Sequence, residues 1–196
     1  MKVIISVTIA LFVATCTFAV IDPDPDSMGL YFDESAEIYC VDEVAMYEVV
    51  TMHLMLTGST HDYIFGFEAG YDITGNAQVV NTLFYDPLYC PVGSPDNMIV
   101  GFSYPYPTFE ATILATILVM NLSTENDVIE FYLHGTTPSS IDPEFPTLLL
   151  AGGIFQVAGI SVEEGPTAQI NGGCAVVPTN TIRFDMVKSL YRDATR

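Results

Sequence analysis

The side chains with the richest chemistry in this sequence are three cysteines, Cys40, Cys90 and Cys174. Thiolates and imidazoles together bind zinc, but no two such residues stand at the spacing of a zinc finger. In an oxidising compartment two of the three cysteines would form a disulfide and one would remain. All three pairings stay open, and each would stabilise the fold by roughly 4 kcal/mol. We expect structural cysteines and no metal site.

Histidines and carboxylates are the candidates for acid–base catalysis, namely His53, His61 and His134 among many Asp and Glu residues. The sequence has no Gly-x-Ser-x-Gly elbow, phosphate loop or His-Glu-x-x-His motif. Carboxylate pairs are frequent, so a secreted hydrolase with an unrecognised carboxylate site stays open as an alternative. The acidic residues are a feature of the composition, however, and no Trp is present to line a sugar subsite. We therefore expect no catalytic residues and a protein that is not an enzyme.

Aromatic residues near a proline-rich stretch are the candidates for ligand binding. Tyr104 and Tyr106 alternate with two prolines, and Tyr89 and Phe102 stand close by in the sequence. Stiff aromatic side chains suit contacts with sugars or peptides. A carbohydrate-binding module that uses this patch is therefore an alternative function, and plain packing at one end of the domain is the competing interpretation.

Clustered carboxylates also suit Ca²⁺. Asp22, Asp24 and Asp26 alternate, but the intervening Pro23 and Pro25 are typical of an extended linker. No stretch has the spacing of a calcium-binding loop. Calcium stays possible without a motif that indicates it, and we expect no cofactor.

The charge of the chain limits its partners. It has 24 acidic residues against five Lys and Arg, a formal net charge of −19, and no Lys or Arg between Val20 and Ile182. Nucleic acids and anionic membranes are bound through basic surfaces. The composition therefore argues against both partners for the body of the protein, and leaves an extracellular protein or a glycan. It does not indicate the oligomeric state.

The N-terminus has the layout of a secretory signal peptide, with one cation, an apolar run and small residues at Thr17 and Ala19. We expect cleavage after Ala19, so that residues 1–19 are removed. A retained anchor is less consistent with the short apolar run. Lipidation of Cys16 is a further alternative. The protein is expected to be secreted or held at the cell surface, with the periplasm as another possibility.

The stretch from Val49 to Ile73 predicts two strands rather than a helix. Val50, Met52, Leu54 and Leu56 fall on one face of the first strand, the period of two that a pleat imposes. In the second strand alternate positions are aromatic or Ala, which places Glu68 on the opposite, solvent-facing side. The expected core set of this strand is Tyr63, Phe65, Phe67, Ala69 and Tyr71. We expect the two strands to pair.

Further alternating segments follow, separated by polar and Gly/Pro-rich turns. The segment from Glu110 to Ser123 is apolar on both faces and rich in β-branched residues, which predicts a central strand. Asp127–Gly135 should form a hairpin with it. The sequence therefore predicts an all-β, antiparallel two-sheet β-sandwich of about eight to ten strands.

The domain limits follow from composition. Residues 20–27 form an expected flexible Pro/Asp leader, and residues 28–178 form the sandwich. Residues 179–196 hold the remaining cations, and Met186, Val187, Leu190 and Tyr191 recur at helical spacing. We expect a short amphipathic C-terminal helix there, whose role stays open.

The chain resembles a group of uncharacterised exported bacterial proteins that open with a Gly-x-Tyr-x-Asp strand, here Gly29, Tyr31 and Asp33, and close with a Val-Lys-Ser-Leu-Tyr-Arg tail, here Val187–Arg192. Its strand pattern over 44–177 is similar to cohesin-type sandwiches, which share architecture with carbohydrate-binding modules and jelly rolls. The resemblance carries over no partner-binding residue, and no dockerin-like repeat is present. It implies a noncatalytic extracellular or cell-surface module for binding or structure, the function that we expect.

Overall fold

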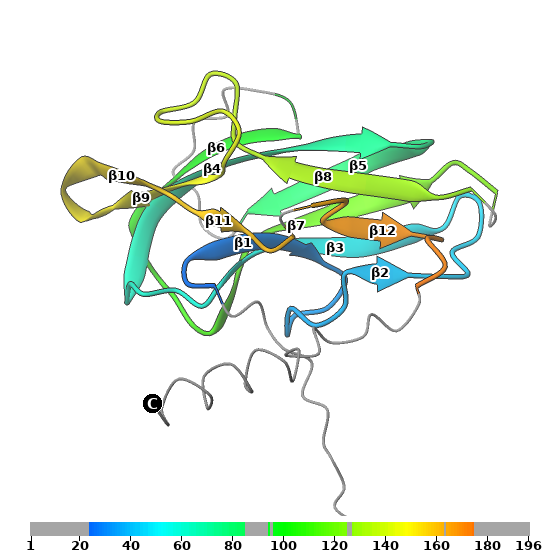
Figure 1. Ribbon diagram of the computed structural model, residues 1–196, viewed down its shortest axis with the longest axis horizontal. Coiled ribbons are helices and arrows are strands. Elements are labelled where there is room, and N and C mark those ends of the chain that lie inside the picture. The colour runs from blue at the N-terminus through cyan, green and yellow to red at the C-terminus, as the bar shows by residue number, and fades with distance from the viewer. Residues whose placement is uncertain (1–23, 85–93, 95, 125–126, 163, 175–196) are drawn as a thin grey trace, which may run out of the picture.

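The protein is a β-sandwich of two facing sheets (Figure 1). The computed structural model describes residues 24–84, 94, 96–124, 127–162 and 164–174. The predicted all-β, two-sheet architecture is confirmed. The C-terminal helix expected at 179–196 lies outside the described residues, as do the signal peptide and Cys16.

One sheet, here called sheet A, has five strands in the order β11-β1-β3-β7-β5. All neighbours are antiparallel except β1 and β11, which are parallel. Its strands are β1 (Ser27–Tyr31), β3 (Val49–Thr57), β5 (Ala77–Phe84), β7 (Ala111–Asn121) and β11 (Gly159–Ile160).

The other sheet, sheet B, has seven strands in the order β10-β9-β4-β8-β12-β2, with β6 paired to the other edge of β4. Its strands are β2 (Cys40–Val41), β4 (Tyr63–Thr74), β6 (Asn97–Pro107), β8 (Ile129–His134), β9 (Thr147–Leu150), β10 (Ile154–Val157) and β12 (Ala168–Ile170). A short 3₁₀ turn, η1 (Ala151–Gly153), joins β9 to β10.

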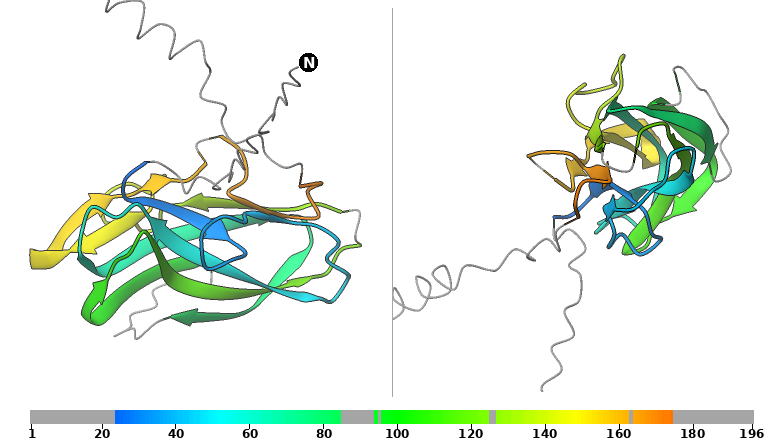
Figure 2. Two further views of the ribbon diagram at one scale, coloured as in Figure 1. Left: turned by 90° about the horizontal axis from the view of Figure 1, so that it is seen from below. Right: turned by 90° about the vertical axis from the view of Figure 1, so that its right-hand side faces the viewer.

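From β1 to β8 the chain changes sheet at every step, and this overturns two expected pairings. The strands β3 and β4 follow one another in the sequence but lie in opposite sheets, and so do β7 and β8. The connections between them are therefore arches across the core and not hairpin turns (Figure 2). Alternation shows which face of a strand is buried. It does not show whether the next strand lies in the same sheet or in the opposite sheet, because in both arrangements the two strands turn an apolar face to the same core.

The predicted core face of β3 is confirmed. Met52, Leu54 and Leu56 are fully buried, and Val50 packs against the same cluster. The expected central strand is confirmed as β7, which lies between β3 and β5. One face of β7 is buried and the other is partly covered. Leu114 and Ala115 are buried in succession where the register with β3 shifts, which interrupts the alternation.

The predicted core face of β4 is right for its second half and wrong for its first. Phe67, Ala69 and Tyr71 are buried, whereas Tyr63 lies exposed and its place in the core is taken by Ile64. The register between β4 and β6 shifts between Ile64 and Gly66. Four residues of β6, 102–105, lie opposite Phe65 alone, so the pairing is irregular here and a strict period of two does not hold through it.

Glu68, expected to face solvent, is only 5% exposed. Its carboxylate accepts hydrogen bonds from the backbone N–H of Ser140 at 2.9 Å and from the Ser140 hydroxyl at 2.5 Å. The Glu68 side chain does leave the core face, as the alternation predicts. The 135–146 connection then folds over it, because its backbone and hydroxyl donors stabilise the charge.

The start of the domain also differs in detail. Ser27 already belongs to β1, and Asp26 is buried and hydrogen-bonded, although both were placed in the leader. The short strand β2 that follows β1 in the chain lies in the other sheet. Among the described residues there is no helix of the length and apolarity needed to cross a membrane.

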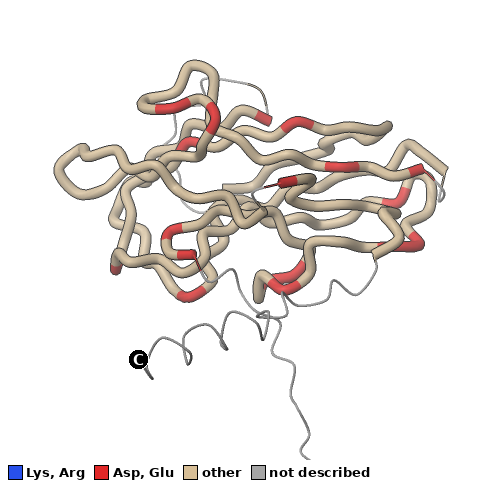
Figure 3. Tube along the Cα trace, in the orientation of Figure 1, with Lys and Arg blue, Asp and Glu red and all other residues tan. Residues whose placement is uncertain are grey.

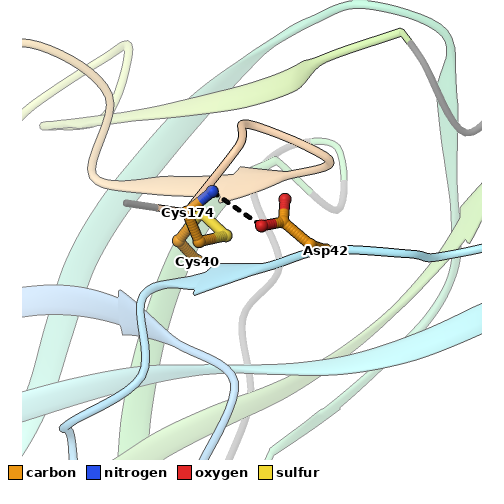
Figure 4. A group of neighbouring side chains, drawn as sticks. All are labelled: Cys40, Asp42 and Cys174. Carbon is orange, nitrogen blue, oxygen red and sulfur yellow. Dashed lines mark hydrogen bonds between the residues drawn. A yellow bond between two sulfur atoms is a disulfide. The ribbon is translucent and has the colours of Figure 1, made fainter. Parts of the chain in front are cut away.

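The disulfide joins Cys40 to Cys174 (Figure 4). It links β2 to the residues that follow β12, and these two strands are parallel neighbours. Asp42 reinforces the junction by accepting hydrogen bonds from the backbone N–H groups of Gly173 at 3.0 Å and Cys174 at 2.7 Å. Cys90, the third candidate, lies outside the described residues.

We predict that Leu56→Ala lowers the free energy of unfolding by about 2–5 kcal/mol, because it leaves a cavity at a fully buried position between the sheets. The matched control is Val80→Ala in β5, where half of the side chain is exposed and a change within about 0.5 kcal/mol is expected. Urea unfolding measures both. Equal effects of the two substitutions would refute the assignment of the core face.

We also predict that removal of the disulfide destabilises the protein by about 5 kcal/mol in the chain-entropy account, because the bridge spans a sequence separation of 134 residues. The test compares the unfolding of the oxidised chain with that of Cys40→Ser/Cys174→Ser. A double variant as stable as the parent would contradict the prediction.

Candidate functional site

The outer face of sheet B presents a flat array of polar side chains on β4, β8 and β12. Side chains of β8 alternate strictly, with Ile129, Phe131 and Leu133 in the core and the intervening residues outside. The strand register brings these outer residues beside those of β4 and β12. We call this set the outer-face array; it consists of Asp72, Thr74, Glu130, Tyr132, His134 and Gln169.

Hydrogen bonds fix the centre of the array. The Tyr132 hydroxyl donates to one carboxylate oxygen of Glu130 at 2.8 Å, and the amide of Gln169 donates to the other at 3.1 Å. At the end of β8, Nε2 of His134 lies 3.7 Å from the Asp72 carboxylate, a distance at which the two form an ion pair when the imidazole is protonated. The array is thus held on three adjacent rigid strands.

The Tyr132–Glu130 hydrogen bond has an electrostatic consequence. The hydrogen bond to Glu130 raises the pKa of the Tyr132 hydroxyl above its ordinary value of 10.0. Burial and the negative charge of Glu130 make smaller contributions in the same direction. The one hydroxyl proton of Tyr132 is donated to Glu130, so toward a partner the hydroxyl oxygen can act as a hydrogen-bond acceptor. Glu130 offers its remaining lone pairs outward, which suits a donor or cation on a partner.

The predicted aromatic patch is only partly assembled. Phe102 belongs to the core and stacks on Tyr106, with ring centroids 4.7 Å apart, and the Tyr106 hydroxyl donates to the Ile113 carbonyl. Tyr104 is 75% exposed. Tyr89 lies outside the described residues. A shared platform of these rings stays a prediction.

The three histidines lie in separate places. His53 is buried in sheet A beside the hydroxyl of Thr116, and burial lowers its pKa below the ordinary value of 6.5 despite the attraction of Glu34 and Asp33. His61 lies between the strands β3 and β4, near Asp26. His134 belongs to the outer-face array. Within the described part of the chain no hydrogen bond joins a histidine ring to a serine or cysteine side chain.

One group of potential metal ligands occurs in the described residues, namely Cys40, Asp42 and Cys174. The two sulfur atoms are bonded to one another, and the Asp42 carboxylate already accepts two backbone N–H groups. A disulfide sulfur is a poor ligand, because metal binding by cysteine needs the thiolate. The group therefore cross-links β2 to the residues that follow β12.

A shallow depression of about 650 Å³ lies at the end of the sandwich where the β4–β5 and β7–β8 connections meet. Its lining residues are Met46, Gly75, Asn76, Leu122, Ser123, Thr124, Asp127 and Val128. The Asp127 carboxylate accepts hydrogen bonds from the N–H and hydroxyl of Thr124. The depression thus brings no pair of carboxylates together and offers no acid–base constellation.

Acidic residues are spread over the surface, and the described residues include no Lys or Arg (Figure 3). Neutral donors replace cations as partners of the buried carboxylates. Asp26 accepts the backbone N–H of Thr60 at 2.8 Å, the Thr60 hydroxyl at 2.6 Å and the Gln156 amide at 3.1 Å. Burial opposes ionisation, but these bonds and the nearby His61 outweigh it and hold the pKa of Asp26 below its ordinary value of 3.8.

Sequence reasoning missed the outer-face array. The signal was present in β8, where Glu130, Tyr132 and His134 alternate with large apolar residues. The positions of Asp72 and Gln169 beside them depend on long-range pairing with β4 and β12, which a local pattern does not contain.

No protein-family model and no curated protein sequence matches this chain. Solved structures with a similar arrangement of strands include the sixth cohesin from Acetivibrio cellulolyticus scaffoldin B, in complex with a Cel5 dockerin mutant, at 12% identity and a TM-score of 0.49, covering 76% of this chain and 99% of the cohesin.

A cohesin module from a Clostridium perfringens family 33 glycoside hydrolase has 6% identity and a TM-score of 0.41, covering 69% of this chain and 97% of its own. The seventh ScaB type I cohesin from Pseudobacteroides cellulosolvens has 9% identity and a TM-score of 0.42, covering 74% and 89%. These likenesses concern the arrangement of strands and carry nothing about binding. The resemblance to the exported group with the Gly29–Asp33 and Val187–Arg192 motifs stays a prediction.

We predict that Asp26 contributes a loss of stability as the pH falls below 3.8. Its pKa is lower in the folded chain than the ordinary value of 3.8, so in that window the unfolded chain takes up a proton that the folded chain does not. The contribution is complete above 3.8 and disappears as pH falls through the folded pKa. Urea unfolding at successive pH values measures it.

The informative variant is Asp26→Asn, because Asn tolerates the positive φ of 56° at this position and keeps one acceptor oxygen. Its stability should depend less on pH below 3.8 than that of the parent. Asp62→Asn, at an exposed position, is the control and should follow the parent curve. If the Asp26→Asn curve also parallels the parent, Asp26 does not carry this dependence.

Proposed function

We propose that the protein is a noncatalytic extracellular or cell-surface module that binds a protein partner through the outer-face array of sheet B. The observation that carries this proposal is the hydrogen-bonded set of Gln169, Glu130 and Tyr132, fixed on neighbouring strands and open to solvent. Side chains held in place before binding lose little entropy when a partner docks.

The shape of the site supports a macromolecular partner over a small molecule. Small ligands are held in concave, mostly apolar pockets. The outer-face array is instead spread over β4, β8 and β12, on the flat side of a sheet, and its groups are polar. A protein surface can contact such an array at several points at once.

Charge supports a partner with basic or donor groups. Asp72 and Glu130 contribute negative charge to the array, and the described residues carry no Lys or Arg that would neutralise it. Complementary charge on a partner accelerates association and selects against acidic competitors.

Two features support an extracellular location. The N-terminal residues have the pattern of a secretory signal peptide. The Cys40–Cys174 disulfide fits an oxidising compartment, where such bonds persist.

The alternative of a carbohydrate-binding module has one observation in its favour, the high exposure of Tyr104 on β6. An exposed ring can stack on a sugar. A glycan array tests it: retention of a specific glycan that Tyr104→Ala abolishes would favour this alternative, and Phe102 and Tyr106 would then be tested as supporting positions.

The protein-binding proposal is tested by affinity capture from the envelope and culture fluid of the producing cells, with the full chain as bait. We expect specific retention of a protein partner. Asp72→Asn/Glu130→Gln should weaken retention at least tenfold, since loss of each charged contact costs on the order of 1.5–3 kcal/mol.

The matched control is Glu37→Gln/Asp62→Asn, which removes the same two charges at exposed positions away from the array. It should retain the partner like the parent. Equal weakening by both pairs would show that only net charge matters, and no weakening by the first pair would exclude the outer-face array as the binding site.

A further inference from the structure

The edge strands of the two sheets differ in whether they are protected against pairing with another strand. An edge strand presents unpaired backbone N–H and C=O groups, and proteins blunt such edges with short strands, bulges, prolines or charges. In this sandwich the edges are β2, β5, β6, β10 and β11.

Four of these five edges carry a protective feature. The strands β2 and β11 have two residues each. The register of β5 shifts between Val79 and Asn81, which interrupts its edge. The strand β6 contains Pro105 and Pro107, which have no N–H to donate.

The strand β10 carries none of these features among the described residues. It runs without a register shift from Ile154 to Val157 along β9, and it contains neither proline nor a charged residue. The β9–β10 hairpin also projects from one end of the sandwich in Figure 1 and in the left view of Figure 2.

The exposed side chains of β10 are apolar on both faces of the hairpin. Ile154 is 61% exposed, Phe155 43% and Val157 40%. Gln156 is the exception, because its side chain is used inside the molecule on Asp26 and His61. An apolar, regular and unprotected edge is a site for strand addition.

Charge indicates which partner fits this edge. No acidic residue lies on the hairpin, although acidic residues are spread over the rest of the molecule (Figure 3). A basic partner would be attracted to the acidic surfaces and would gain nothing from a neutral edge. A partner that is itself strongly acidic needs a contact free of carboxylates, because like charges at an interface are strongly unfavourable.

We propose that β10 pairs antiparallel with β10 of a second copy of this chain, which continues sheet B across a two-fold axis. A second copy has the same net charge of −19 and the same neutral edge. In this arrangement Phe155 and Val157 of both copies share one face of the joined sheet, and the symmetry makes the contact close on itself as a dimer.

The contact is small, since it joins two strands of four residues each. Interfaces below about 1,200 Å² are typical of weak and transient association. The dimer therefore forms at high local concentration, as on a crowded surface. It leaves the outer-face array on β4, β8 and β12 accessible, so the inference stands independently of the proposed function.

Sedimentation velocity of the full chain over a wide concentration range tests the proposal, at about 0.01 M and about 1 M NaCl, where the Debye length falls from about 30 Å to about 3 Å. We expect the average sedimentation coefficient to rise with concentration, and more strongly at high salt, because screening reduces the repulsion between two acidic copies. A single monomeric species at every concentration and salt would overturn the proposal, and so would dimerisation that weakens with salt.

Two variants locate the contact. Ile154→Glu should weaken dimerisation at least about tenfold, because it places a carboxylate in the apolar contact. Val80→Glu, on the interrupted edge β5, changes the same charge at a similarly exposed aliphatic position and should dimerise like the parent. Unchanged circular dichroism confirms that both variants fold. Equal dimerisation of the two variants would overturn the assignment to β10.

Discussion

Carboxylates without cationic partners are the constraint that shapes this molecule. The described chain has no Lys or Arg, so neutral donors must stabilise every carboxylate that is removed from water. Asp33 is an example of a carboxylate held by neutral donors, since it accepts hydrogen bonds from the backbone N–H groups of Ser35, Glu37 and Ile38. These bonds outweigh burial and lower the pKa of Asp33 below 3.8. Asp42 and Glu68 hold other connections in the same way.

This mode of stabilisation separates the roles of the two sides of each sheet. Apolar residues between the sheets form the hydrophobic core, and their burial stabilises the fold. Carboxylates on the outside hold the loops that cover parts of the outer faces. The 135–146 connection covers Glu68, and the 32–39 connection covers Tyr31 and Met55. Two of the exposed surfaces among the described residues are the outer-face array and the β9–β10 hairpin. The first is polar and acidic and the second is apolar and uncharged, so the two surfaces suit partners of different kinds.

How much could be predicted from the sequence depends on the range of the interactions involved. The strand class and the buried face of β3 follow from local alternation, and the central position of β7 follows from apolar residues on both of its faces; these predictions are confirmed. The pairing of β3 with β4 was wrong, because a strand that enters an arch has the same alternation as one that enters a hairpin. The shift at Ile64 and the burial of Glu68 depend on a bulge and on a distant loop, neither of which has a local signal. The outer-face array requires the register of three strands, and the sequence supplied only the part of it that lies on β8.

The most direct test of the account is the salt dependence of stability at pH 8. In a domain whose charges repel and whose carboxylates are held by neutral donors, screening removes repulsion without breaking ion pairs. The free energy of unfolding measured by thermal or urea denaturation should therefore rise between about 0.01 M and about 1 M NaCl. A flat dependence or a fall over this range would contradict the account, because it would mean that attractive ion pairs offset the repulsion or hold the fold together.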